Sequence, residues 1–288
     1  MNRQVENIKK ISELLENDAE VLAAIIIGSQ ARSDSIADEY SDIDIIIIVT
    51  NPEQYLLSYD WLRGIGDFHI SFIEPTLFGA KERRILFDDG SDVDFVILNE
   101  KQSQTIQNNE SGVIFARDYR IIKDKIGISE SIEKSKYTSD ATNSANLSEE
   151  ELQNLINDYF FHCVWTMKKV SRGELFTAKS CLDVYMKRLL LTMIENYSCL
   201  SSSKDVWYNG RFIEKWADKW ILDGLTVAYA KYNQSDMINA LLSSMDLFRK
   251  IAIEVMQKQT FTYPKGAETH AYQIVNKYIQ RTRDGEYK

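Results

Sequence analysis

The chain has few of the features that mark disulfide-rich, zinc-binding or membrane proteins. Its 288 residues include three cysteines and three histidines, and no apolar run approaches the ~18 residues of a membrane span. Cys163, Cys181 and Cys199 lack metal-ligand spacing, so we expect reduced, buried thiols in a cytoplasmic protein. The histidines are scattered and give no zinc cluster. We expect no signal peptide and no transmembrane helix.

The composition otherwise is that of an ordinary globular protein. Apolar residues make up 44% and charged residues 27%, and the length allows two modest domains. The charge is uneven: residues 1–150 carry 28 acidic and 15 basic side chains, whereas residues 151–288 carry 15 and 19. An acidic first half would repel nucleic acid and attract a cationic ligand, and it is equally compatible with a solvated acidic surface.

Two short apolar runs flank the most informative stretch. Val21–Ile27 and Ile45–Val49 are β-branched and bounded by polar residues, which predicts strands buried on both faces. Gly28-Ser29 follows the first run, where a helix should begin, and Asp42-Ile43-Asp44 leads into the second. Residues two apart on an extended chain point to the same side, so we expect the two carboxylates to lie close together.

This arrangement has a chemical meaning. Adjacent carboxylates repel each other, and a divalent cation between them relieves the repulsion; hard oxygen ligands suit magnesium or manganese. Gly28 lets the backbone approach a ligand closely. Ser29 offers a hydroxyl and an amide at a helix start, which favours phosphate binding. Metal carboxylates beside a phosphate cradle indicate nucleotidyl transfer.

The rest of the chain divides into two parts. The first half predicts a mixed sheet with flanking helices: besides the two strands above, we expect a helix over residues 2–17, a helix from Pro52, and four further strands. Those strands cover His69–Ile73, Arg83–Phe87, Val93–Leu98 and Val113–Phe115, and Tyr119–Ile122 is a candidate to continue the last of them.

The second half has a different periodicity. Ser129–Ser148 is poor in apolar residues and predicts a linker. Beyond it, apolar residues at helical spacing predict at least four helices and hence a bundle. We therefore predict an α+β protein, with a first domain over residues 1–135 and an all-α helical-bundle domain over residues 150–288.

The Gly28-Ser29 and Asp42-Ile43-Asp44 pair resembles the signature of the nucleotidyltransferase superfamily that shares the polymerase-β palm. This resemblance implies two cations and a third carboxylate on another strand. Asp94 is the candidate, because an apolar strand follows it directly, and it could ligate a cation or take the proton from the acceptor hydroxyl. Asp92 has the same parity, so either acid could fill the role, although its place in a turn gives it another explanation.

The string from Gly28 to Asp44 is most similar to the aminoglycoside 6-adenylyltransferase (streptomycin adenylyltransferase) family. Ile85–Gly90 leading to Asp94, Arg172–Leu175 and Tyr263-Pro264 resemble further blocks of that family, so the similarity covers nearly the whole chain. The resemblance implies transfer of AMP from ATP to a hydroxyl of a streptomycin-type aminoglycoside, with two Mg²⁺ or Mn²⁺ ions, giving antibiotic resistance. The substrate would lie in a cleft. Asp92 departs from the family pattern, where a neutral or basic residue is expected.

The resemblance also implies roles for single residues. Asp42, Asp44 and Asp94 would be catalytic metal ligands, and Gly28 and Ser29 would cradle the β- and γ-phosphates. Four further residues are candidates, each with an ordinary structural alternative. Arg32, Ser41 and Lys179 are candidates for nucleotide binding, and Asp183 is the candidate for binding a cationic acceptor.

Several alternatives stay open from the sequence. The acceptor could be another antibiotic or a protein hydroxyl, or the chain could be a non-catalytic nucleotide-binding regulator. RNA is a weaker option, because the acidic first half lacks a basic track. We expect ATP and a small cationic acceptor as partners, no nucleic acid and no membrane, and a monomer or a homodimer.

Overall fold

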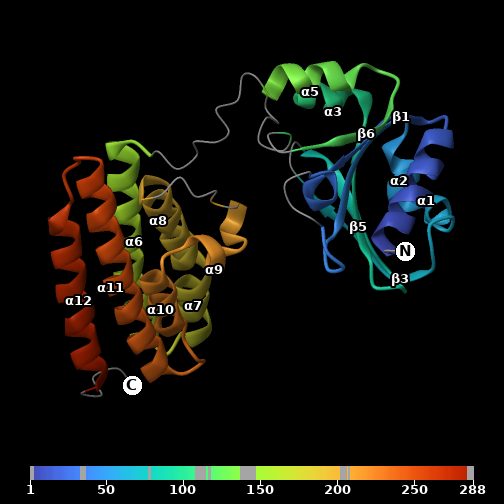
Figure 1. Ribbon diagram of the computed structural model, residues 1–288. Coiled ribbons are helices and arrows are strands. Elements are labelled where there is room, and N and C mark those ends of the chain that lie inside the picture. The colour runs from blue at the N-terminus through green and yellow to red at the C-terminus, as the bar shows by residue number, and fades with distance from the viewer. Residues whose placement is uncertain are drawn as a thin grey trace. The chain divides into compact units, whose positions relative to one another are not determined.

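The computed structural model describes most of the chain, in two compact units. They are Met1–Thr142 and Asn143–Lys288 (Figure 1), and each has its own hydrophobic core. In the part of the chain that is described, none of the helices has the length and apolar character needed to cross a membrane. The described residues are 3–32, 37–76, 79–107, 115, 118–136, 147–201, 206 and 208–283.

The first unit is built on a six-stranded sheet with the order β3-β4-β5-β2-β1-β6. β2 and β5 are parallel and every other neighbouring pair is antiparallel, which confirms the predicted mixed sheet. The strands are β1 (Val21–Ile27), β2 (Ile43–Val49), β3 (Phe68–Pro75), β4 (Lys81–Phe87), β5 (Asp92–Leu98) and β6 (Arg120–Asp124).

Helices cover the two faces of this sheet. α1 (Arg3–Asn17) and α2 (Pro52–Leu57) pack on one face, whose core includes Ile45 and Ile47. α3 (Glu100–Gln107) and α5 (Ile128–Lys136) pack on the other, whose core includes the alternate β2 residues Ile46 and Ile48. Asp44 and Asp94 share parity with this second set, so they belong to the α3/α5 face of the sheet, beyond its apolar part.

Two sequence expectations in this unit need correction. The predicted linker over residues 129–148 is wrong at its start, because α5 continues to Lys136. Ile128 and Ile132, one helical turn apart, are fully buried, and this anchors the otherwise polar helix. Residues 137–146 lie outside the described residues. So do residues 113 and 114 of the predicted strand, while Phe115 is helical and buried.

The β4–β5 hairpin is held from outside the sheet. Gly90 takes a positive φ of 81° in the turn, and Phe87 N–H donates to the Ser91 carbonyl at 2.9 Å. Asn7 on α1 donates to the Ser91 hydroxyl at 2.6 Å and to the Asp89 carboxylate at 3.0 Å. The first helix thus fixes the turn from which β5 starts.

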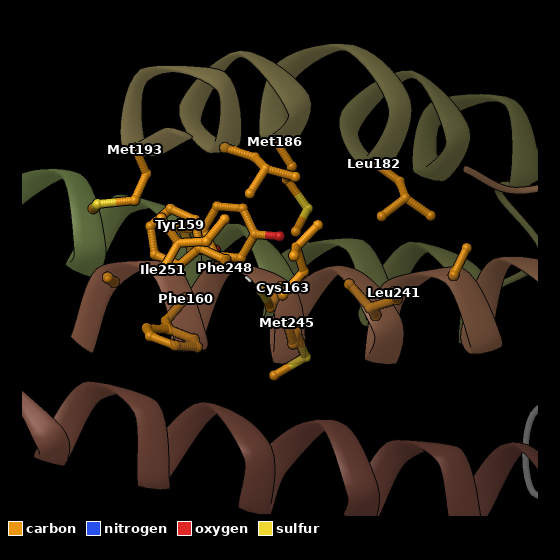
Figure 2. Packing of buried hydrophobic residues seen from close by; sticks show 14 of the residues in the cluster. Tyr159, Phe160, Cys163, Leu182, Met186, Met193, Leu241, Met245, Phe248 and Ile251 are labelled. Carbon is orange, nitrogen blue, oxygen red and sulfur yellow. Dashed lines mark hydrogen bonds between the residues drawn. The ribbon is translucent and has the colours of Figure 1, made fainter. Parts of the chain in front are cut away.

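The second unit consists entirely of helices in its described part. Its core is apolar and aromatic: the rings of Tyr159 and Phe248 stack 3.6 Å apart (Figure 2), and the Tyr159 hydroxyl donates to the Ser244 carbonyl at 2.9 Å. The α-helices are α6 (Glu149–Ser171), α7 (Leu175–Ser180), α8 (Met186–Ser201), α9 (Ile213–Trp216), α10 (Lys219–Ala228), α11 (Gln234–Lys258) and α12 (Lys265–Arg283).

The predicted helix over residues 175–189 contains an irregularity. Cys181–Tyr185 forms a π-helical turn between α7 and α8. A single π turn leaves the apolar stripe almost intact, so periodicity alone does not reveal it, and such turns are frequent at functional sites. Cys163 and Cys181 are buried free thiols as expected, whereas Cys199 is only half-buried.

Candidate active site

Three aspartates converge on the α3/α5 face of the sheet. Asp42, Asp44 and Asp94 each offer a carboxylate oxygen, and these oxygens all lie within 4.8 Å of one another. Asp94 is buried, with 6% of its surface exposed, and the other two are half-buried. Of the acid, histidine and cysteine side chains that are described, this is the group with the spacing to hold a metal ion.

The strand register explains the convergence. β2 and β5 are parallel neighbours, and Asp44 lies directly opposite Asp94. Asp42 precedes β2 and has the same parity as Asp44. The apolar residues that follow both acids lock the register, because a slip by one residue would turn every buried side chain to the wrong face.

Position 28 requires glycine because its backbone lies close to one of these acids. It follows Ile27, which pairs with Asp44 across β1 and β2, and it adopts φ +70°. A Cβ at this position would lie 2.2 Å from Asp44 Oδ2. Only glycine therefore combines this backbone conformation with the observed position of the carboxylate.

The turn after β1 brings polar groups next to the aspartates. Gly28–Ala31 forms a 3₁₀ turn, and the Ser29 hydroxyl donates to the backbone carbonyl of Asp42 at 3.4 Å. Gln30 Nε2 is buried and has no hydrogen-bond acceptor among the described residues. A buried donor without an acceptor is costly unless a ligand supplies one. The sequence interpretation did not single out Gln30.

Arg84 on β4 is the cationic neighbour of the aspartates. It pairs in register with Asp94, and its Nη2 donates to Asp94 Oδ2 at 2.5 Å. Burial raises the pKa of Asp94 to about 6; the charge and hydrogen bond of Arg84 lower it, while the charges of Glu82 and Asp42 raise it. Several carboxylates therefore lie close together in a partly desolvated site, and their negative charge favours a bound cation.

The donor set fits the divalent ions inferred from the sequence. Three carboxylates within reach of one another are hard oxygen ligands suited to Mg²⁺ or Mn²⁺. The missing Cβ at Gly28 leaves the Asp44 carboxylate accessible beside the turn. Asp42, Asp44 and Asp94 would hold such ions.

The sequence of this chain matches a family model described as streptomycin adenylyltransferase over residues 1–282. The chain belongs to the streptomycin adenylyltransferase family. It is accordingly a nucleotidyltransferase. It is 21% identical over 261 residues to the aminoglycoside 6-adenylyltransferase of Bacillus subtilis (strain 168), covering 86% of this chain and 88% of that protein.

Two solved structures are also similar. The aminoglycoside 6-adenyltransferase from Bacillus subtilis has a TM-score of 0.47 at 16% identity, covering 97% of this chain and 98% of that one. A nucleotidyltransferase-like protein from Exiguobacterium sibiricum 255-15 has a TM-score of 0.32 at 11% identity, with 89% and 78% covered. Membership of the streptomycin adenylyltransferase family rests on the match over the whole chain, not on these two likenesses.

The structure shows the surroundings of three further residues that the sequence analysis considered. The Ser41 hydroxyl bonds the Asp38 backbone N–H and carboxylate at 3.0 Å, which favours the turn role that the sequence left open. Arg32 directly follows the 3₁₀ turn and is half-buried. Asp92 is exposed and lies opposite Leu86, outside the aspartate cluster.

Lys179 and Asp183 lie in the second unit and pair with each other. The Lys179 ammonium donates to Asp183 Oδ2 at 2.5 Å and also to the Ala230 carbonyl. Asp183 belongs to the π-helical turn, and its Oδ1 is buried with no hydrogen-bond partner in the described part of the chain. It lines a cavity of about 780 Å³ together with Glu214 and Arg188.

Arg84, like Gln30, is a residue of this site that the sequence reasoning missed. The register of the hairpin places it there: Leu86 pairs with Asp92, so the residue two positions further from the turn pairs with Asp94.

Proposed function

We propose that this nucleotidyltransferase moves AMP from ATP to a hydroxyl of a streptomycin-type aminoglycoside and releases pyrophosphate, in a reaction that depends on Mg²⁺ or Mn²⁺. The observation that carries the proposal is the convergence of Asp42, Asp44 and Asp94 beside the Gly28–Ala31 turn. The family match supports the choice of reaction, and the name of the Bacillus subtilis relative, an aminoglycoside 6-adenylyltransferase, supports the choice of acceptor.

The proposed roles follow from the surroundings of each residue. Asp42 and Asp44 would hold the cations, and Asp94 would complete their binding and accept the proton of the acceptor hydroxyl. Bound cations would neutralise the triphosphate and increase the acidity of the attacking hydroxyl. Gly28, Ser29 and the amide of Gln30 contact phosphate oxygens. Positioning and charge stabilisation supply most of the rate enhancement.

We assign the acceptor to Asp183 and the cavity that it lines. The cavity volume of about 780 Å³ falls in the range of small-molecule sites. The unpaired Oδ1 of Asp183 can accept a hydrogen bond from an amine or guanidinium group of the acceptor. Lys179 is the candidate for contact with the triphosphate, as the family resemblance implies; its ammonium group bonds Asp183 and the Ala230 carbonyl.

Release of pyrophosphate tests the proposal. The purified chain is incubated with ATP and streptomycin, with Mg²⁺ or with EDTA, and the products are identified by mass spectrometry. We expect release only with all three components, together with an adenylylated drug. A panel of other aminoglycosides, lincosamides and protein acceptors identifies a different acceptor. Magnesium-dependent ATP binding without pyrophosphate release from any acceptor would favour a non-catalytic regulator.

A further inference from the structure

Arg84 lies next to the carboxylate cluster and is close to three acidic side chains. Its guanidinium bonds Asp94 Oδ2 at 2.5 Å, while its Nε donates to Glu82 Oε1 at 2.6 Å and lies 3.4 Å from Glu74 Oε1. Glu74, Glu82 and Arg84 belong to the antiparallel strands β3 and β4, and Arg84 in turn faces Asp94 on β5. The Arg84 guanidinium thus links carboxylates on three adjacent strands.

The hydrogen bond from Arg84 fixes one oxygen of the Asp94 carboxylate. Among the described residues, Arg84 is the one side chain that donates a hydrogen bond to Asp94. Asp94 is 6% exposed, so water cannot easily replace that bond. With Oδ2 held by Arg84, Oδ1 remains as the oxygen that a cation or a substrate hydroxyl can use.

Arg84 is itself held in place. The Glu82 side chain is only 13% exposed and accepts the Nε hydrogen bond, so the guanidinium is fixed at both ends. A charge-assisted bond between partly buried groups is stronger and more directional than an exposed ion pair. This distinguishes Arg84 from a surface arginine that pairs with whichever acid is near.

We propose that Arg84 is a positioning residue for Asp94: it orients the third carboxylate toward Asp42 and Asp44 and offsets part of the negative charge of the cluster. This inference rests on the proposed function of the same site. Two effects follow. Without Arg84, the Asp94 carboxylate loses its orientation and turnover falls. The cluster also becomes more negative, so a divalent cation binds it more tightly.

These opposite signs provide the test. In the full chain, Arg84→Ala should lower kcat for pyrophosphate release with ATP and streptomycin by about tenfold. It should lower the Kd for Mn²⁺, followed by the electron paramagnetic resonance of free Mn²⁺, by about threefold or more. Arg84→Lys restores the charge and should return the Mn²⁺ affinity toward that of the wild type. Glu82→Ala, which only loosens Arg84, should lower kcat less than Arg84→Ala.

A matched control and a double-mutant cycle complete the experiment. Lys81→Ala removes one positive charge from an exposed position on the other face of β4, and should leave kcat and the Mn²⁺ affinity within about twofold of the wild type. If Arg84 acts through Asp94, Arg84→Ala should have no further effect on kcat in an Asp94→Asn background.

The outcomes separate the two proposals. If the wild type neither binds Mn²⁺ nor releases pyrophosphate, the proposed function fails and the role of Arg84 fails with it. If the wild type does both, the role of Arg84 alone is overturned by an unchanged kcat in Arg84→Ala, by weaker Mn²⁺ binding, or by an undiminished effect in the Asp94→Asn background. The last result would indicate that Arg84 contacts a substrate directly.

Discussion

Strands β2 and β5 begin with the same pattern and use it differently. Asp42-Ile43-Asp44 leads into β2 and Asp92-Val93-Asp94 opens β5, and the two strands are parallel neighbours with Asp44 opposite Asp94. Both acids of the first pattern belong to the carboxylate cluster, but only Asp94 of the second does. The repeated pattern therefore does not give the two strands equivalent roles.

The neighbouring strands account for the difference. β2 lies between β1 and β5, so its acids face the Gly28 turn on one side and Asp94 on the other. β5 has β4 as its outer neighbour, and there Arg84 contacts Asp94 while Asp92 lies opposite Leu86. A carboxylate joins the site only where the adjacent strand supplies a partner or leaves room for a ligand.

Replacement of Asp44 should have the largest effect. Asp44→Ala removes the carboxylate that lies beside Gly28 and within 4.8 Å of the Asp94 carboxylate, and we expect kcat to fall by at least about 10³-fold because the cation loses a direct ligand. Far-ultraviolet circular dichroism should match the wild type, since Asp44 is half-buried at the end of the apolar core. Turnover near the wild-type level, together with full Mn²⁺ binding, would show that Asp44 is not part of the site.

Replacement of Asp94 should come next. Asp94→Asn keeps the shape and the place opposite Arg84 but removes the charge and the capacity to accept a proton, so we expect kcat to fall by about 10²-fold. Initial rates of pyrophosphate release measure this. A loss of kcat of less than threefold would mean that another group takes the proton. The position of Asp94 opposite Asp44 would then have no role in the reaction.

Gly28 tests whether the turn and β2 act together. Gly28→Ala should lower kcat by about 10- to 100-fold, because the new Cβ forces the Asp44 carboxylate to move. Both this variant and Gly127→Ala should lose about 1 kcal/mol of stability in urea unfolding, because each glycine has a positive φ near 70°. Gly127 has open space around its Cβ position, so its variant should keep full activity. Equal activities of the two variants would contradict the close-approach argument.

Asp92 should give the smallest effect. It is exposed and outside the cluster, so Asp92→Asn should change kcat and the Mn²⁺ affinity by less than about twofold. A loss of kcat comparable with that of Asp94→Asn would mean that Asp92 also belongs to the site. The two acids of β5 would then act like the two acids that lead into β2.

The sequence predicted the features that depend on local patterns. The apolar runs of β1 and β2 and the spacing of Asp42 and Asp44 were sufficient to predict two strands with paired carboxylates at their ends. The i, i+4 spacing of Lys179 and Asp183 is also a helical pattern, and their ion pair could have been inferred from it. Asp94 required the resemblance to the superfamily, because its partners lie 50 residues away in the sequence.

Other features depend on pairings that single-sequence patterns do not contain. The contact between Arg84 and Asp94 requires the number of residues in the β4–β5 turn, which fixes the register. Helix α5 was missed because it is mostly polar, and two buried isoleucines against the sheet stabilise it. The cavity next to Asp183 depends on how α8 and α10 pack, which periodicity does not specify.

The most direct test of the carboxylate site is the location of its cation. Crystals of the full chain grown with Mn²⁺ and a non-hydrolysable ATP analogue would show the metal by its anomalous scattering. We expect Mn²⁺ bound to the carboxylates of Asp42, Asp44 and Asp94 and to phosphate oxygens of the analogue. Mn²⁺ on the nucleotide alone, or on Asp92 with the three aspartates making no contact to metal, would contradict it.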